Sequence, residues 1–141
     1  MKLFDAWGEE LHHTINTTRR ATVKYLMLIK HEERYRNDAI PEGLLEAMGK
    51  FVEESFKNGS LVDTAGLQPS AKGARIRVSR GKAKVIDGPF TESKEIVGGY
   101  AIVQADTRER AMEIAKEFVD LHLEHWPGFE FECEIRPQEA M

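Results

Sequence analysis

The sequence predicts a single α+β domain built from a strand–helix–strand unit, a β-hairpin and a second strand–helix–strand unit. The length of 141 residues fits one domain. Two segments, following residues 41 and 106, carry apolar residues at the i, i+3, i+4 spacing of helices, and shorter apolar or alternating runs lie between them. With 41% of its residues hydrophobic, the chain has enough apolar material for one core.

The first unit is predicted to begin at residue 23. The run 23–29 is apolar on nearly both alternate sets, which is typical of a central strand, and residues 31–39 are predicted to form a loop. Pro41 suits the first turn of a helix, because its missing N–H is not needed there, and Asn58–Gly59 supplies the residue that ends it. The apolar stripe of this helix consists of Leu44, Leu45, Met48, Phe51, Val52 and Phe56. Residues 61–67 are predicted to form the second strand.

A hairpin is predicted to follow at 75–85. Apolar residues alternate with charged ones along both halves, and Arg80–Gly81 supplies the turn. One face is then apolar, and the other is a basic, solvated face. The basic residues are Arg75, Arg77, Arg80, Lys82 and Lys84.

The second unit is predicted from residues 100–136. Residues 100–105 alternate as a core strand, and Asp106 is placed to cap a helix with Glu109 three residues on, as in a capping box. The buried stripe of this helix consists of Ala111, Ile114, Ala115 and Phe118. Pro127–Gly128 breaks the chain before a last strand, 129–136.

Two strand–helix–strand units of this kind predict a ferredoxin-like βαββαβ sheet with both helices on one face. The opposite face of the sheet would leave much apolar surface in water, which favours a homodimer in which two sheets pair. The domain is predicted to span 23–137, with a C-terminal tail at 138–141. Residues 1–22 are predicted to form a helical extension, since Phe4, Trp7, Leu11 and Ile15 recur at helical spacing.

Charge and composition exclude several classes of function. The net charge of −4 is mixed along the chain, which argues against direct nucleic-acid binding. No apolar run is long enough to cross a membrane, and the N-terminus lacks a signal-peptide pattern. The single cysteine, Cys133, fits a reducing, cytoplasmic compartment and is predicted to be a buried strand residue. His122 and His125 share a helix face, but no third ligand is fixed by spacing, so we expect no metal.

The most informative segment is 85–100. It contains Asp87-Gly88-Pro89-Phe90, then Thr91-Glu92-Ser93-Lys94-Glu95, then Gly98-Gly99-Tyr100. This segment resembles the signature loop of the Asp-Gly-Pro-Phe (DGPF) branch of the YCII-related family, and the segments 24–29, 66–69 and 132–137 resemble other parts of that family. The resemblance covers 23–137. It implies a ferredoxin-like unit that dimerises into an α/β barrel, and it implies no particular substrate.

The resemblance also suggests catalytic residues. In the YCII branch a His–Asp pair has been proposed as an active site, which points here to Asp87 and to His31, directly after the first strand. Asp-Gly-Pro is equally strong turn chemistry, so Asp87 is alternatively a structural residue. We expect a pocket that holds a small polar molecule. Its predicted lining is Phe90, Thr91, Lys94, Gly98, Gly99 and Tyr100.

Two functions remain open at this point. The first is an acid–base enzyme without a cofactor, in which Asp87 moves a proton, His31 assists, and Tyr100 and Lys94 orient the substrate. The alternative is a non-catalytic dimer that binds a metabolite or regulates a partner. The resemblance keeps this alternative open, because some members of the family are encoded near sigma-type transcription factors or fused to them.

Overall fold

The computed structural model describes residues 22–90 and 95–140, apart from the side chains of residues 36 and 37. The predicted extension 1–22 therefore lies almost entirely outside the described residues, as do the signature-loop residues Thr91 and Lys94. The strands are β1 (Val23–His31), β2 (Leu61–Gly66), β3 (Ala74–Ser79), β4 (Lys82–Asp87), β5 (Ile96–Ala105) and β6 (Glu132–Pro137). The helices are α2 (Glu42–Lys57) and α3 (Arg108–His125), with short 3-10 turns η1 (Glu33–Asn37) and η2 (Ser70–Lys72).

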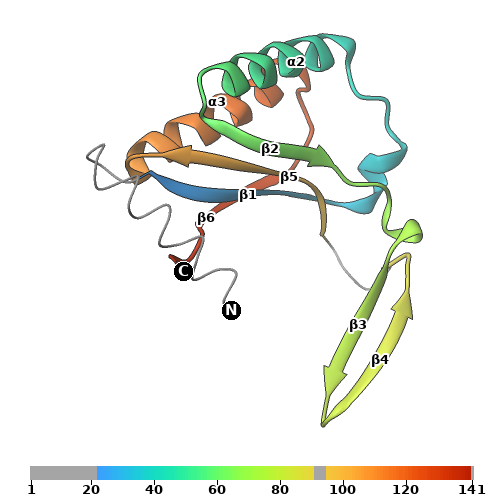
Figure 1. The fold of residues 1–141 in the computed structure, drawn as a ribbon. Helices are drawn as coiled ribbons and strands as arrows, with labels where there is room; N and C mark the ends of the chain where they lie inside the picture. The colour runs from blue at the N-terminus through green and yellow to red at the C-terminus, as the bar shows by residue number, and fades with distance from the viewer. Residues whose placement is uncertain (1–21, 91–94, 141) are drawn as a thin grey trace.

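Four strands form one antiparallel sheet in the order β2-β5-β1-β6, and both long helices cover the same face of it (Figure 1). β1 and β2 run parallel to each other with β5 between them, as a strand–helix–strand unit requires. The predicted α+β class is confirmed, and the strand order is compatible with a ferredoxin-like fold. None of the described helices is long and apolar enough to cross a lipid bilayer.

The core lies between the sheet and the two helices. Met27 of β1 and Val103 of β5 point to the helices and are buried, where they meet Ile114 of α3. Because side chains alternate along a strand, Leu28 lies opposite Tyr100 on the other face of the sheet, where both are half-buried. In the described residues, one face of the sheet packs on the helices, and the other face is open and has apolar side chains at its centre.

The hairpin β3–β4 is a separate two-stranded sheet that extends away from the main body (Figure 1). Its register pairs Ala74 with Asp87 at the base and Ser79 with Lys82 at the tip. Arg80 and Gly81 form the turn with positive φ values of 52° and 78°, as the sequence predicts.

Three local predictions require correction. The cap of α3 is Thr107, whose hydroxyl accepts from Arg110 N–H at 3.1 Å, so the capping position lies one residue beyond Asp106. The last strand begins at Glu132 and not at Phe129, because Phe129 and Phe131 pack in an aromatic cluster and their backbone does not pair with β1. The segment 31–39, predicted as a loop, contains η1.

Cys133 lies in β6 as expected, with its side chain half-buried against the core. Burial raises the pKa of its thiol to about 11. The thiol is therefore protonated near neutral pH, and this agrees with a structural residue and not with a nucleophile.

Candidate functional site

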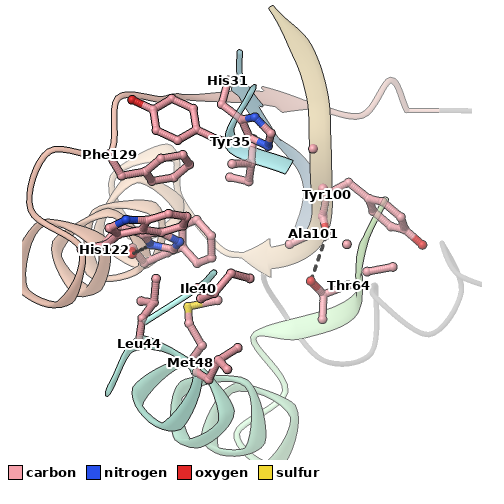
Figure 2. Close-up of a pocket in the computed structure, with 18 of the residues that line it drawn as sticks. His31, Tyr35, Ile40, Leu44, Met48, Thr64, Tyr100, Ala101, His122 and Phe129 are labelled. Carbon is pink, nitrogen blue, oxygen red and sulfur yellow. Dashed lines mark hydrogen bonds between the residues drawn. The ribbon is translucent and has the colours of Figure 1, made fainter. Parts of the chain in front are cut away.

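A cavity of about 300 Å³ lies between the helix-facing side of the sheet and the helices, at the end where β1 finishes and β5 begins (Figure 2). Its wall is largely apolar. The apolar and aromatic lining includes Ile40, Leu44, Met48, Phe118, Trp126 and Phe129. A concave, mostly apolar site with a few polar groups is the usual form of a small-molecule site.

His31 is the first of two buried histidines in this cavity. Its Nδ1 lies 2.8 Å from the carbonyl oxygen of Glu32. Because a carbonyl only accepts hydrogen bonds, Nδ1 carries the proton, and Nε2 of the neutral ring holds the lone pair. This arrangement fixes the tautomer in which Nε2 is able to accept a proton.

Gly98 makes room for this ring. The register of β5 against β1 passes from Gly99 to Val97 while β1 advances by one residue, so Gly98 is the extra residue of a β-bulge. A Cβ at Gly98 would overlap Nε2 of His31, and a Cβ at Gly99 would lie 3.1 Å from the carbonyl oxygen of Ala65. The Gly98–Gly99 pair is therefore explained by close approach, first of an imidazole and then of a neighbouring strand.

His122 of α3 is the second buried histidine in the cavity. Its Nδ1 lies 2.9 Å from the carbonyl oxygen of Phe118, which again places the proton on Nδ1 and the lone pair on Nε2. Burial lowers the pKa of the His122 imidazole. The ring is therefore held neutral in an apolar setting, and Nε2 is suited to accept a hydrogen bond from a ligand.

Aromatic side chains close the end of the cavity near His31 (Figure 2). Phe129 stacks on Trp126 with 4.3 Å between ring centroids and meets Tyr35 edge to face at 4.7 Å. The Tyr35 hydroxyl accepts from the backbone N–H of Glu130 at 3.3 Å and donates to the carbonyl oxygen of Gly128 at 3.4 Å. Tyr35 thus ties the loop after α3 to η1 and holds Phe129 over the cavity.

Tyr100 contributes to the cavity through its backbone. Its carbonyl oxygen accepts a hydrogen bond from the Thr64 hydroxyl at 2.9 Å, whereas the phenol points away from the cavity (Figure 2). The phenol donates to Asp63 at 3.0 Å, and this hydrogen bond raises the pKa of Tyr100. The hydroxyl that was expected to orient a substrate is thus engaged on the open face of the sheet.

The signature residues 87–90 lie at the base of the hairpin. A Cβ at Gly88 would overlap the carbonyl of Ser70, so this glycine is required by close packing. The Ser70 hydroxyl accepts from the backbone N–H of Phe90 at 3.1 Å, and the Phe90 ring lies 3.8 Å from the guanidinium carbon of Arg75. The carboxylate of Asp87 is exposed and has no hydrogen bond or ion pair among the residues that the structure describes.

A second cavity, of about 510 Å³, lies beside this loop. Phe90, Lys72 and Arg75 line it, together with Lys30 from the strand face opposite to His31. Lys30 is held by Glu134 at 2.7 Å and Glu132 at 3.1 Å, which raise its pKa. Its ammonium group is therefore engaged within the sheet.

Comparison with known proteins identifies the family. The sequence model of the YCII-related domain family matches residues 23–119, which is well over half of the chain. This protein belongs to the YCII-related family. The chain is also 30% identical over 81 residues to an uncharacterized protein of Rhizobium meliloti (strain 1021). That match covers 57% of this chain and 62% of the relative, so the chain spans less than two thirds of the relative's length.

The structure of this YCII-related protein brings some predicted site residues together and separates others. His31, Gly98, Gly99 and the backbone of Tyr100 share the first cavity. Phe90 lines the second cavity, and Asp87 is not among the described lining residues of either. Within the described residues, no three His, Cys, Asp or Glu side chains converge on a possible metal position.

Sequence reasoning did not place His122 in the cavity and considered it as a possible metal ligand beside His125. The signal was available, because His122 follows Phe118 by four residues and so continues the buried stripe of α3. Tyr35 was also missed, since it lies in a charged segment that was predicted to be a loop. No periodicity within that segment marks it as buried.

Proposed function

We propose that this YCII-related protein is a cytoplasmic, cofactor-independent acid–base enzyme that acts on a small molecule held between sheet and helices. The observation that carries the proposal is His31, a buried histidine in the first cavity whose Nδ1–H is fixed on the Glu32 carbonyl. This hydrogen bond leaves the lone pair on Nε2, which lies beside the backbone of Gly98 in the wall of the cavity, and a fixed tautomer with a free lone pair suits a general base.

The chemistry proposed is the removal of a proton from a carbon or oxygen of the substrate. The proton moves to Nε2 of His31, and the resulting imidazolium keeps its hydrogen bond from Nδ1 to Glu32. His122, held neutral, accepts a hydrogen bond from a second polar group of the substrate. The aromatic walls supply the rest of the binding energy, so the substrate has an apolar body with polar groups at its ends.

Asp87 has a secondary place in the proposal. The sequence Asp87-Gly88-Pro89-Phe90 supports assignment to the DGPF branch, and the His–Asp pair proposed for the YCII branch suggests that Asp87 would pair with a histidine. The carboxylate of Asp87 is exposed and lies at the hairpin base, and the described lining of the first cavity does not include it. His31 is therefore the principal base, and Asp87 is a second acid–base group to be tested separately. Thr91 and Lys94 remain proposed binding residues outside the described part of the chain.

The alternative function is a binding or regulatory dimer without catalysis. One observation favours it, namely that the Tyr35 and Thr64 hydroxyls in the cavity already have protein partners. Hydroxyl groups that are already bound within the protein are not available to take part in a reaction, so such a cavity suits retention of a ligand. The two functions differ in whether a bound ligand exchanges protons with the protein.

The test begins with a fragment library of small aromatic and aliphatic acids, enols and ketones, screened by ligand-observed NMR. Ligands that bind are then incubated in D2O with the wild type, His31→Gln and Asp87→Asn. An enzyme incorporates deuterium at one carbon-bound position with the wild type and loses this activity in His31→Gln while binding persists. If ligands bind the wild type and none incorporates deuterium beyond the protein-free rate, the binding function replaces the enzymatic one.

We propose further that the chain acts as a homodimer. Support comes from the open face of the sheet, where half-buried Leu26 and Leu28 of β1 face Ile102 and Tyr100 of β5. Pairing two such faces would form the dimeric α/β barrel that the DGPF resemblance implies. The mass of the protein in solution tests this proposal.

A further inference from the structure

The β3–β4 hairpin has an apolar face that no other described strand covers (Figure 1). Its register places Ile76 opposite Val85 and Val78 opposite Ala83, so these four side chains share one face. Ile76 is 69% exposed, Val78 is 73% exposed and Val85 is 63% exposed. We call this hairpin, residues 74–87, the arm.

Such an arm is unfavourable on its own. A two-stranded hairpin is marginally stable in water, and clustered β-branched residues on its surface gain free energy only when another surface covers them. A solvated strand face would carry polar residues at these positions, as the opposite face of the arm does. The pattern therefore indicates a binding face.

The charge of the arm indicates what binds it. The arm carries five cationic side chains against the single carboxylate of Asp87, a net charge of +4. Because the whole chain has a net charge of −4, the remaining residues sum to −8. A second copy of the chain therefore offers an acidic body to a basic arm, whereas two arms packed on each other would repel.

We propose that the arm of each subunit packs its apolar face against the body of a second copy of the chain, so that two arms are exchanged in a two-fold symmetric dimer. Each interface is then formed twice, as an isologous dimer requires. This inference deepens the homodimer proposed above and rests on it, but it concerns a different surface from the open face of the sheet. A nucleic acid, the other partner suggested by a basic hairpin, would leave the apolar face uncovered.

The experiment is sedimentation velocity of the full chain over a concentration series. We compare the wild type with the arm variant Ile76→Ser/Val85→Ser, whose two sites face each other in the ladder. The control is Leu123→Ser on α3, where the native side chain is 65% exposed and lies outside the arm. The expected result is a dimer for the wild type and the control, and a dimer dissociation constant raised at least tenfold in the arm variant.

The charge contribution is tested by Arg77→Glu/Lys84→Glu, a pair that also faces each other on the arm. This variant is expected to weaken the dimer without changing the apolar face. Hydrogen exchange of the arm amides gives a second readout, with protection that rises with protein concentration in the wild type. A variant that has lost only docking keeps the protection of its core amides but no longer gains protection of the arm with concentration. A variant that has lost its fold loses protection throughout the chain.

The possible outcomes separate the two dimer surfaces. If both arm variants dimerise like the wild type, the arm proposal is wrong and the open-face dimer stands. If the arm variants dissociate while Leu28→Asp on the open face does not, the arm is supported and the open-face dimer fails. A monomeric wild type overturns both dimer proposals. If the arm amides are protected from hydrogen exchange when an oligonucleotide is added but not when the protein concentration is raised, the partner of the arm is a nucleic acid and the arm proposal is wrong.

Discussion

The backbone of Gly98 lies directly against the imidazole of His31. A methyl group at Gly98 would overlap Nε2 of the ring and lie 2.7 Å from its Cδ2. The β-bulge at Gly98 brings β5 close to the end of β1, and the absence of a side chain leaves space for a buried histidine. The position of the proposed base therefore depends on a glycine in the neighbouring strand.

Replacing Gly98 with alanine is expected to displace the His31 ring. The ring must turn or the strands must separate, and overpacking of this kind costs about 1–3 kcal/mol of unfolding free energy. Chemical denaturation measures this loss, and ligand binding in the first cavity is expected to weaken with it.

The matched control is Gly66→Ala at the same cavity, where a Cβ would meet nothing within 4 Å. This variant is expected to change stability by less than about 1 kcal/mol. Equal losses for Gly66→Ala and Gly98→Ala would show that strand glycines matter here for their backbone and that the contact with His31 does not.

Much of the fold could be predicted from the sequence, because strong periodicity reflects burial. The stripe that begins at Leu44 predicted α2, although Leu45 and Phe56 at its edges are exposed. The alternation in 100–105 predicted the second part of β5, which begins at Ile96. The cap of α3 was misplaced by one residue because the adjacent Asp106 and Thr107 are both good capping residues. The last strand was extended too far because Phe129 looks like a strand residue, yet it stacks on Trp126.

The candidate site was predictable only in part. Gly98 and Gly99 were recognised as places of close approach, but the sequence does not say that the approaching group is His31. Tyr100 was predicted to line the pocket, but its phenol points away from the cavity (Figure 2). Alternation along a strand separates two sets of side chains, and only the register against the neighbouring strands decides which set faces the cavity. Contacts between distant segments decide these points, and single-sequence patterns do not contain them.

Replacing Gly88 with alanine is expected to disrupt the base of the arm. A Cβ there would overlap the carbonyl of Ser70, and backbone yields less readily than a flexible side chain. We expect a loss of about 3 kcal/mol or more, measured by denaturation, with faster hydrogen exchange in the arm. Gly73→Ala is the control, because its Cβ would lie 3.6 Å from the same carbonyl oxygen, an ordinary contact. An unchanged Gly88→Ala would contradict the packing explanation of the signature glycine.

The cap of α3 provides a prediction that separates two adjacent residues. Thr107→Ala removes the hydroxyl that accepts from Arg110 N–H and is expected to cost about 0.5–2 kcal/mol. Asp106→Ala, at the position first predicted to be the cap, is expected to cost less than about 0.5 kcal/mol. Thermal unfolding of both variants measures the difference. A larger loss in Asp106→Ala would restore the original capping assignment.

The buried His122 is expected to make stability depend on pH. Burial lowers its pKa in the folded protein below the unfolded value of about 6.5. The unfolded chain therefore binds more protons as the pH falls below about 6.5, so the stabilisation is complete above that pH and is lost as the pH falls through the folded pKa. We expect the melting temperature of the wild type to fall more steeply between about pH 7.5 and 5 than that of His122→Gln, which has no titrating ring. If the melting temperatures of the two proteins change with pH in the same way, the His122 ring is hydrated in the folded protein. Its assignment as a neutral hydrogen-bond acceptor in the cavity would then be wrong.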